Sequence, residues 1–141
     1  MKISARNQLK GAISAVAEGA VNGVVSIDLG STQIKADITM EAIKDLGLKE
    51  GMDAVAIVKA SNVMFATDTE RVAGISARNQ IAGIVVSVKK GAVNGHVAIE
   101  TADGARIMGS ITNEAIDELG LAEGGKALAI VKATDVIVGV E

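Results

Sequence analysis

The hexapeptide ISARNQ occurs twice in the chain, at Ile3–Gln8 and letter for letter at Ile75–Gln80. The pentapeptide GAVNG repeats at the same separation, at Gly19–Gly23 and Gly91–Gly95. Two long matching segments in fixed order indicate one structural unit that is present twice, so length alone underestimates the number of domains. We therefore expect two small tandem domains of one fold.

One loop changes the spacing between the copies. The second copy has one extra residue in a TADGA loop, where length changes are tolerated. Beyond it AIVKA still matches itself, at Ala56–Ala60 and Ala129–Ala133. The sequence thus predicts domains at residues 1–68 and 75–141, joined by a polar linker at residues 69–74.

Hydrophobic periodicity indicates mostly strands. In VNGVVSIDL, Val21, Val25 and Ile27 alternate with outward residues, and Val93 begins the equivalent segment, so these residues are expected to face inward. Ile3 and Ile75 are expected to be core anchors. Only TMEAIKDLG and its counterpart have helical character, with a threonine suited to the N-cap and a glycine suited to the C-terminal end. The predicted class is all-β with one short helix per domain, as two tandem OB-like five-stranded β-barrels, and a simple sandwich is the alternative.

Composition excludes several classes of function. Lys plus Arg number 14 against 17 Asp plus Glu, and the only aromatic residue is one Phe, so neither a basic field nor stacking platforms for nucleic acid exist. No apolar run is long enough to span a membrane and there is no export signal or cysteine, which favours a cytoplasmic protein. His96 is the single histidine and is expected at the surface. Phosphate-loop and dinucleotide motifs are missing, so we expect neither an enzyme nor a cofactor.

The hydrophobic fraction of 49% exceeds what two cores of about 70 residues each need, since domains of that size are barely self-sufficient. We therefore expect the two domains to pack on each other or on further chains.

With these classes excluded, the remaining candidates for function are small polar residues that lie near cationic side chains in the sequence. A tetrahedral dianion needs several hydrogen-bond donors and about two positive charges. Each copy offers a hydroxyl and a guanidinium from its SARNQ segment, and a lysine and strand-end donors from its VKA segment. These candidates are Ser4, Arg6, Lys59, Ala60 and Ser61 in copy one and Ser76, Arg78, Lys132, Ala133 and Thr134 in copy two.

Ordinary structural roles are the alternative for the same residues. The SARN segment can cap a turn with its arginine in a surface ion pair, and the lysine can be a strand-end charge. The GAVNG turn also has two possible roles. Its small residues can simply form a turn, or they can expose backbone amides that bind an anion. Asn7 and Asn79 either add amide donors to the shell around the anion or only brace the turn of their own segment.

SARNQLKG followed by GAVNG, by IT.EAI..LGL..G and by VKAS resembles the molbindin family of Mop domains across nearly the whole of both copies. The resemblance implies an OB-type barrel that binds molybdate or tungstate between the domains of a homo-oligomer. Two domains in one chain imply a trimer with six Mop domains.

The resemblance also implies two classes of oxyanion site. The first adds Ala5 and Ala77 to the residues above. The second uses the backbone of the turns near the threefold axis, namely Gly19, Ala20, Val21 and Asn22 in copy one and Gly91, Ala92, Val93 and Asn94 in copy two. Several relatives carry a serine where Ala42 and Ala115 occur at the helix start, although the helix N-terminal amides are expected to stay available.

The leading hypothesis is a cytoplasmic molybdate- or tungstate-binding protein for storage or homeostasis, without nucleic-acid or membrane partners. The alternatives are an OB-like interaction module and a ligand-sensing component that acts with a separate regulator or transporter subunit.

Overall fold

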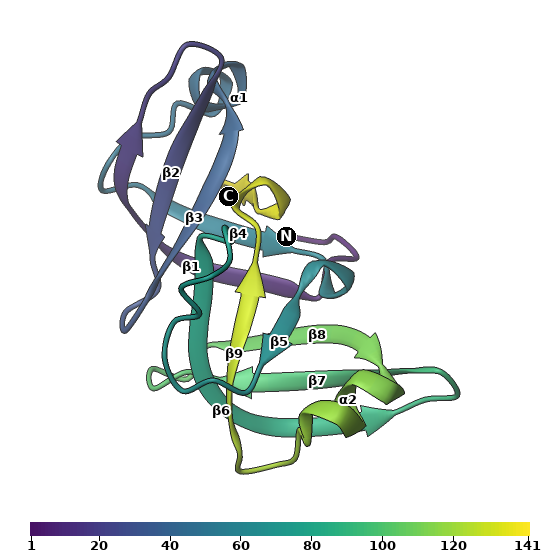
Figure 1. Ribbon diagram of the computed structural model, residues 1–141. Helices are drawn as coiled ribbons and strands as arrows, with labels where there is room; N and C mark the ends of the chain where they lie inside the picture. Colours follow the sequence, from purple (N-terminus) through teal and green to yellow (C-terminus); the bar gives the residue numbers. More distant parts are fainter.

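The computed structural model describes residues 1–141 and consists mainly of β-strands (Figure 1). Each copy contributes three strands, one short helix, a fourth strand, a 3-10 turn and a short last strand, which confirms the expected order. The elements are β1 Asn7–Ala17, β2 Asn22–Asp28, β3 Gln33–Thr39, α1 Met40–Leu46, β4 Asp53–Val58, η1 Ala60–Asn62, β5 Met64–Ala66, β6 Asn79–Lys90, β7 Asn94–Glu100, β8 Arg106–Thr112, α2 Asn113–Leu119, β9 Lys126–Val131, η2 Ala133–Asp135 and β10 Ile137–Gly139.

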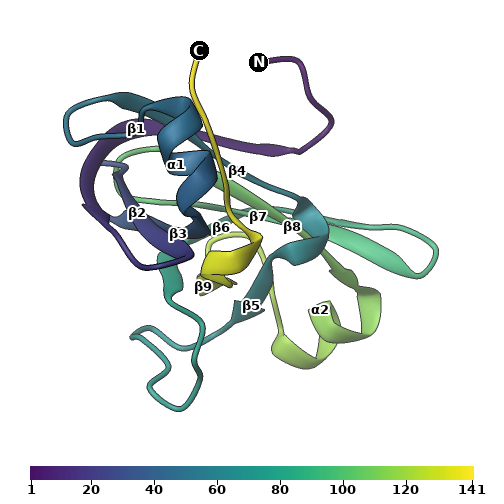
Figure 2. The same ribbon diagram turned by 90° about the horizontal axis from the view of Figure 1, so that it is seen from above.

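The strands form two five-stranded sheets, and the copies exchange their last strands. The orders are β10-β4-β1-β2-β3 and β5-β9-β6-β7-β8. Thus β5 of copy one pairs with β9, and β10 of copy two pairs with β4. Figure 1 shows β5 beside β9 in the lower sheet and the C-terminal segment beside β4. Both termini consequently lie on one side of the molecule (Figure 2), where the Met1 amino group is 2.9 Å from Glu141 Oε1.

The expected class, all-β with five strands and one short helix per domain, is confirmed. Each sheet is open rather than hydrogen-bonded into a closed barrel, as OB-like folds allow. The first strand of each copy pairs with two neighbours along its length, so it must bend between them. A register shift between Ile13 and Ala15, and another between Val85 and Ser87, supplies the bend.

The helix ends follow the predicted capping chemistry. The Thr39 hydroxyl accepts a hydrogen bond from the Ala42 amide at 3.1 Å, and the Thr112 hydroxyl accepts one from Ala115 at the same distance. Gly47 closes α1 with φ of 62°, a left-handed conformation that favours glycine.

A single hydrophobic cluster of 26 buried residues contains side chains from both copies. Pooling the two small cores compensates for the small size of each domain. Four residues expected to face inward are exposed instead: Ile3, Val21, Ile75 and Val93. Ile3 and Ile75 lie ahead of β1 and β6, and the two valines lie in turns before β2 and β7, so the alternation of a strand does not yet apply to them.

Two buried asparagines join the sheets. Asn7 donates through Nδ2 to the Met108 carbonyl and accepts at Oδ1 from the Met108 amide, both at 2.8 Å. Asn79 binds Lys35 in the same way, at 2.8 and 2.7 Å. Each asparagine is only 2% exposed. They therefore bridge the two sheets rather than brace a turn, and each pairs backbone groups on the free edge of β8 or β3.

One pair of positions differs in size between the copies. A Cβ added to Gly109 would lie 2.4 Å from the Phe65 ring, which the exchanged strand β5 carries against β8. The equivalent positions in the other sheet hold Ala36 and Val138, a larger and a smaller residue respectively. The glycine thus makes room for the one aromatic side chain.

We predict that Asn79→Ala lowers the free energy of unfolding by about 1–3 kcal/mol, because the Lys35 amide and carbonyl lose their partners. Asn7→Ala should have a similar effect by symmetry. Urea denaturation measures the free energy of unfolding of both variants. The control is Gln33→Ala, an exposed residue of β3, the strand that carries Lys35. Wild-type stability in both asparagine variants would contradict the bridging role.

We predict that Gly109→Ala destabilises the protein by about 1–3 kcal/mol through overpacking against Phe65. Adding Phe65→Val, which recreates the alanine and valine pair of the other sheet, should recover part of the loss. Gly74→Ala is the control, since a Cβ there meets nothing within 4 Å. If the double variant were less stable than Gly109→Ala alone, this explanation would be wrong.

Candidate functional site

Six of the predicted residues of copy two line one open hollow of about 410 Å³. Ser76–Arg78 precede β6 and Lys132 follows β9, and these strands are neighbours with Asn79 opposite Val131. Sheet register therefore brings the SAR and VKA segments together. The six residues are Ser76, Ala77, Arg78, Lys132, Ala133 and Thr134.

The other copy contributes to the same hollow. Asp37 from β3 and Met64 from β5 also line it, together with Ile75. Arg78 and Lys132 themselves belong to one copy, because they flank paired strands of one sheet. Asp37 and Met64 are the residues that cross from the other copy.

The hollow carries positive charge that no ion pair neutralises. Arg78 and Lys132 are exposed, and neither takes part in any ion pair within 4.0 Å in the chain. Hydroxyl groups of Ser76 and Thr134 add neutral donors beside them. Two cations and two hydroxyls outweigh the single carboxylate of Asp37 around this open space, which suits a small oxyanion.

Copy one repeats the strand register that brings the two segments together. Ser4, Ala5 and Arg6 precede β1, and Lys59 follows β4, with Asn7 opposite Val58. Arg6 donates from Nε to the Ser4 carbonyl at 3.0 Å, which folds the side chain back along its own segment. The turn η1, which holds Ala60 and Ser61, packs beside β8 as η2 packs beside β3.

No group of three or more His, Cys, Asp or Glu side chains is placed to hold a metal ion. His96 is exposed, as expected. None of the helices is both long and apolar enough to cross a membrane.

Comparison with known proteins identifies the repeated unit. The TOBE domain model matches residues 3–65 and 75–138. The chain belongs to the TOBE domain family. The family assignment agrees with the resemblance to Mop domains, and each sequence copy is hereafter called a TOBE domain.

Similar proteins cover the whole chain. The molybdenum transport protein ModE of Herbaspirillum seropedicae is 42% identical over 142 residues, and the molybdenum-pterin-binding protein MopA of Rhodobacter capsulatus is 36% identical over 138 residues. The chain spans about half of the length of these curated relatives, 52% of each. A crystal structure of the cytoplasmic molybdate-binding protein ModG with molybdate bound is 44% identical, has a TM-score of 0.93 and matches over 100% of both chains.

The GAVN turns of both TOBE domains are exposed, and neither lines the hollow described above. In the second domain the Gly91 amide donates to the Asn94 carbonyl, and Asn113 Nδ2 donates to the Gly91 carbonyl, both at 2.8 Å. The turn therefore uses some of its backbone groups internally, and its role in a second class of site stays a prediction.

The helix N-termini differ from expectation. The amides of Ala42 and Ala115 already donate to the capping threonines at 3.1 Å. These two amides are therefore not free to donate to an anion. They cannot take the place of the serine hydroxyls that several relatives carry at the same positions.

Two residues near the second-domain hollow were not anticipated from the sequence. Asp37 reaches it from the other domain, and Arg71 of the linker donates from Nη1 and Nη2 to the carbonyls of Arg78 and Ala77. The sequence distinguishes Asp37 in one way only: the equivalent position of the second copy, 73 residues further on, is Ser110 and carries no charge. Arg71 lies in the linker and has no equivalent.

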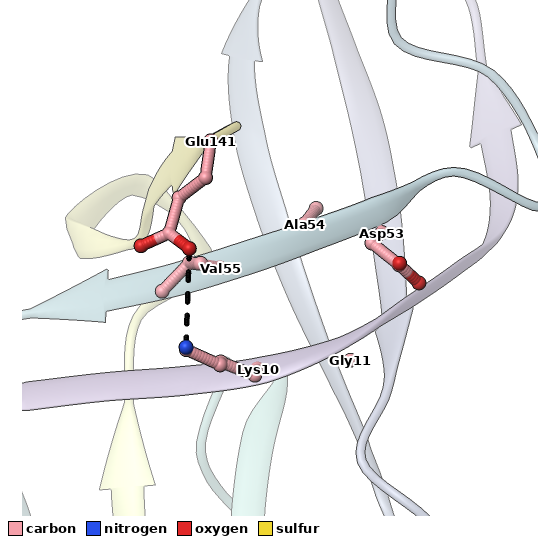
Figure 3. A pocket seen from close by; sticks show the side chains of 6 residues that line it. All are labelled: Lys10, Gly11, Asp53, Ala54, Val55 and Glu141. Atoms are coloured by element: carbon pink, nitrogen blue, oxygen red, sulfur yellow. Dashed lines mark ion pairs between the residues drawn. The ribbon is translucent and has the colours of Figure 1, made fainter. Parts of the chain in front are cut away.

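A second hollow, of about 510 Å³, lies beside β1 and β4 (Figure 3). Lys10 is its only cation, and Lys10 Nζ lies 3.8 Å from Glu141 Oε2. Asp53 adds another carboxylate. Because its cation is already paired and carboxylates outnumber it, this hollow does not suit an oxyanion.

The Glu141 carboxylate has a pKa below its ordinary value of 4.5, chiefly through the hydrogen bond from the Met1 amino group and next through the charge of Lys10. The ion pair thus favours the folded state above pH 4.5, and its contribution is lost as pH falls through the lowered pKa.

We predict that Lys10→Ala raises the Glu141 pKa toward 4.5, as followed by NMR titration of its carboxyl carbon. N-terminal acetylation should raise it further, because the amino group supplies the larger effect. Lys49→Ala, remote from the pair, should leave it unchanged. An ordinary Glu141 pKa in the unmodified protein would contradict the geometry.

Proposed function

We propose that this chain binds molybdate or tungstate through its TOBE domains, as a cytoplasmic protein of storage or homeostasis rather than an enzyme. The observation that carries the proposal is the convergence of Arg78 and Lys132, both without an ion pair, with two hydroxyl groups around one hollow. The matching arrangement at Arg6 and Lys59 provides a second such site. The similarity to ModG, solved with molybdate bound, supports the choice of ligand.

The proposed first-class sites comprise Ser4, Ala5, Arg6, Lys59, Ala60 and Ser61 in one domain and their six equivalents in the other. Both domains would use the same chemistry: a guanidinium, an ammonium and hydroxyl groups that hold the oxygens of a tetrahedral dianion. Charge-assisted hydrogen bonds of this kind contribute roughly 1.5–3 kcal/mol each, enough in combination to offset the desolvation of the anion.

We further propose that the sites are completed in a homotrimer. The second-domain hollow is open, and the apolar residues Met64 and Ile75 at its border are 47% and 43% exposed. Ile3 and Ile137 are the exposed equivalents near the first-domain site. A neighbouring chain that covers these side chains would exclude water from the anion and strengthen its hydrogen bonds. The GAVN turns, with Val21 and Val93 more than two thirds exposed, would form the second class of site near the threefold axis.

A second candidate function is a ligand-sensing component that acts with a separate regulator or transporter subunit. The similarity to ModE, of which this chain covers half, favours it. Copurification of the chain with a DNA-binding or ATPase subunit would support sensing, whereas a free oligomer that binds many anions would support storage.

The proposal predicts heat of binding when purified protein is titrated with molybdate or tungstate. Arg78→Ala and Lys132→Ala should each weaken the second-domain site by about tenfold or more, the effect of losing one charge-assisted hydrogen bond. Lys49→Ala, an exposed lysine outside both sites, is the control. Native mass spectrometry with and without molybdate would count subunits and anions together. No heat with either anion would refute the proposal, and a monomer with anions bound would refute only the trimer.

A further inference from the structure

The two TOBE domains place different residues beside otherwise matching anion sites. Asp37 on β3 lines the second-domain hollow with Arg78 and Lys132. The equivalent position on β8 is Ser110, because Asp37 pairs with Val24 and Ser110 pairs with His96 in the same register of the two sheets. The turn η1 packs on β8 as η2 packs on β3. The second-domain hollow is thus lined by a carboxylate, at the position where the sheet of the other domain carries the Ser110 hydroxyl.

Nothing within the chain neutralises the Asp37 carboxylate. Its Oδ1 atom is buried without a hydrogen-bond partner, and neither Arg78 nor Lys132 lies within ion-pair distance of it. A fully deprotonated oxyanion has no proton to donate to this oxygen, so the two groups repel each other. Ser110 carries no charge and can donate its hydroxyl to the same anion.

One further difference acts in the same direction. The 3-10 turn η2 ends in Asp135, where η1 ends in Asn62. The positive charge of Arg71 would favour an anion at the Asp37 site, but its guanidinium donates to the carbonyls of Ala77 and Arg78 and does not line the hollow.

We infer that the two first-class sites are unequal, with the Ser110 site binding a tetrahedral dianion more tightly than the Asp37 site, so that the chain fills them in sequence. This inference rests on the proposed oxyanion-binding function. The residue at this one position on β3 or β8 sets the difference. In water-like surroundings, one negative charge near a dianion weakens binding by about tenfold, and by more where the site is covered.

Single-site proteins separate the two affinities. Arg78→Ala combined with Lys132→Ala removes both cations of the Asp37 site and leaves the Ser110 site. Arg6→Ala combined with Lys59→Ala leaves the Asp37 site. Titration calorimetry with molybdate should give a dissociation constant at least about tenfold lower for the first double variant than for the second. In the protein that keeps only the Asp37 site, adding Asp37→Ser should strengthen binding by a similar factor. In the protein that keeps only the Ser110 site, Ser110→Asp should weaken it.

Controls distinguish charge from folding. Asp37→Asn keeps the shape of the side chain and removes the charge, so it should strengthen binding as Asp37→Ser does. Asp45→Asn removes the same charge from the exposed surface of α1 and should change nothing. Equal affinities in the two single-site proteins, or no effect of Asp37→Ser and Asp37→Asn, would overturn the inference while leaving oxyanion binding intact. Absence of binding in the unmodified protein would instead refute the proposed function on which the inference rests.

Discussion

The reciprocal hydrogen bonds of Asn7 and Asn79 are the constraint on which the arrangement of the two sheets depends. Each asparagine offers one donor and one acceptor to a backbone amide and carbonyl of the opposite sheet, at 2.7 to 2.8 Å. Few other side chains present both groups in this geometry. Because the asparagines are buried, loss of either would leave polar backbone groups unpaired. This explains why ISARNQ keeps its asparagine in both copies.

The same segment connects the fold to the proposed chemistry. The arginine that precedes each asparagine lies where the first strand begins, next to the lysine that follows its paired strand. Exchange of the last strands then brings η1 beside β8 and η2 beside β3. Each proposed site thereby lies near the contact between the domains. The asparagine fixes the register of that contact, and the arginine and lysine occupy its border.

Much of this organisation was predictable from the sequence. The internal repeat predicted two units, and the alternation of apolar and polar residues predicted strands. The threonine and the glycine of TMEAIKDLG predicted the helix ends. The six predicted residues of copy two lie together because the register of neighbouring strands within one copy brings the ends of β6 and β9 side by side. Ile3 and Val21 were misplaced because periodicity cannot show where a strand starts.

The strand exchange and the role of Asp37 required the structure. The two copies carry the same AIVKA strand, so this strand does not show which of the two last strands pairs with it. Only the three-dimensional path shows which pairing is made. Asp37 and Ser110 occupy equivalent positions in otherwise ordinary strands, and the difference between them becomes informative only when Asp37 is seen to line the hollow of Arg78 and Lys132.

Anomalous scattering at the molybdenum edge, from crystals grown with molybdate, would locate the bound anions in the protein. We expect a peak between Arg78 and Lys132 beside η2, and a stronger one at the matching place between Arg6 and Lys59. Peaks found only elsewhere, for example beside Lys10 and Glu141, would contradict this expectation.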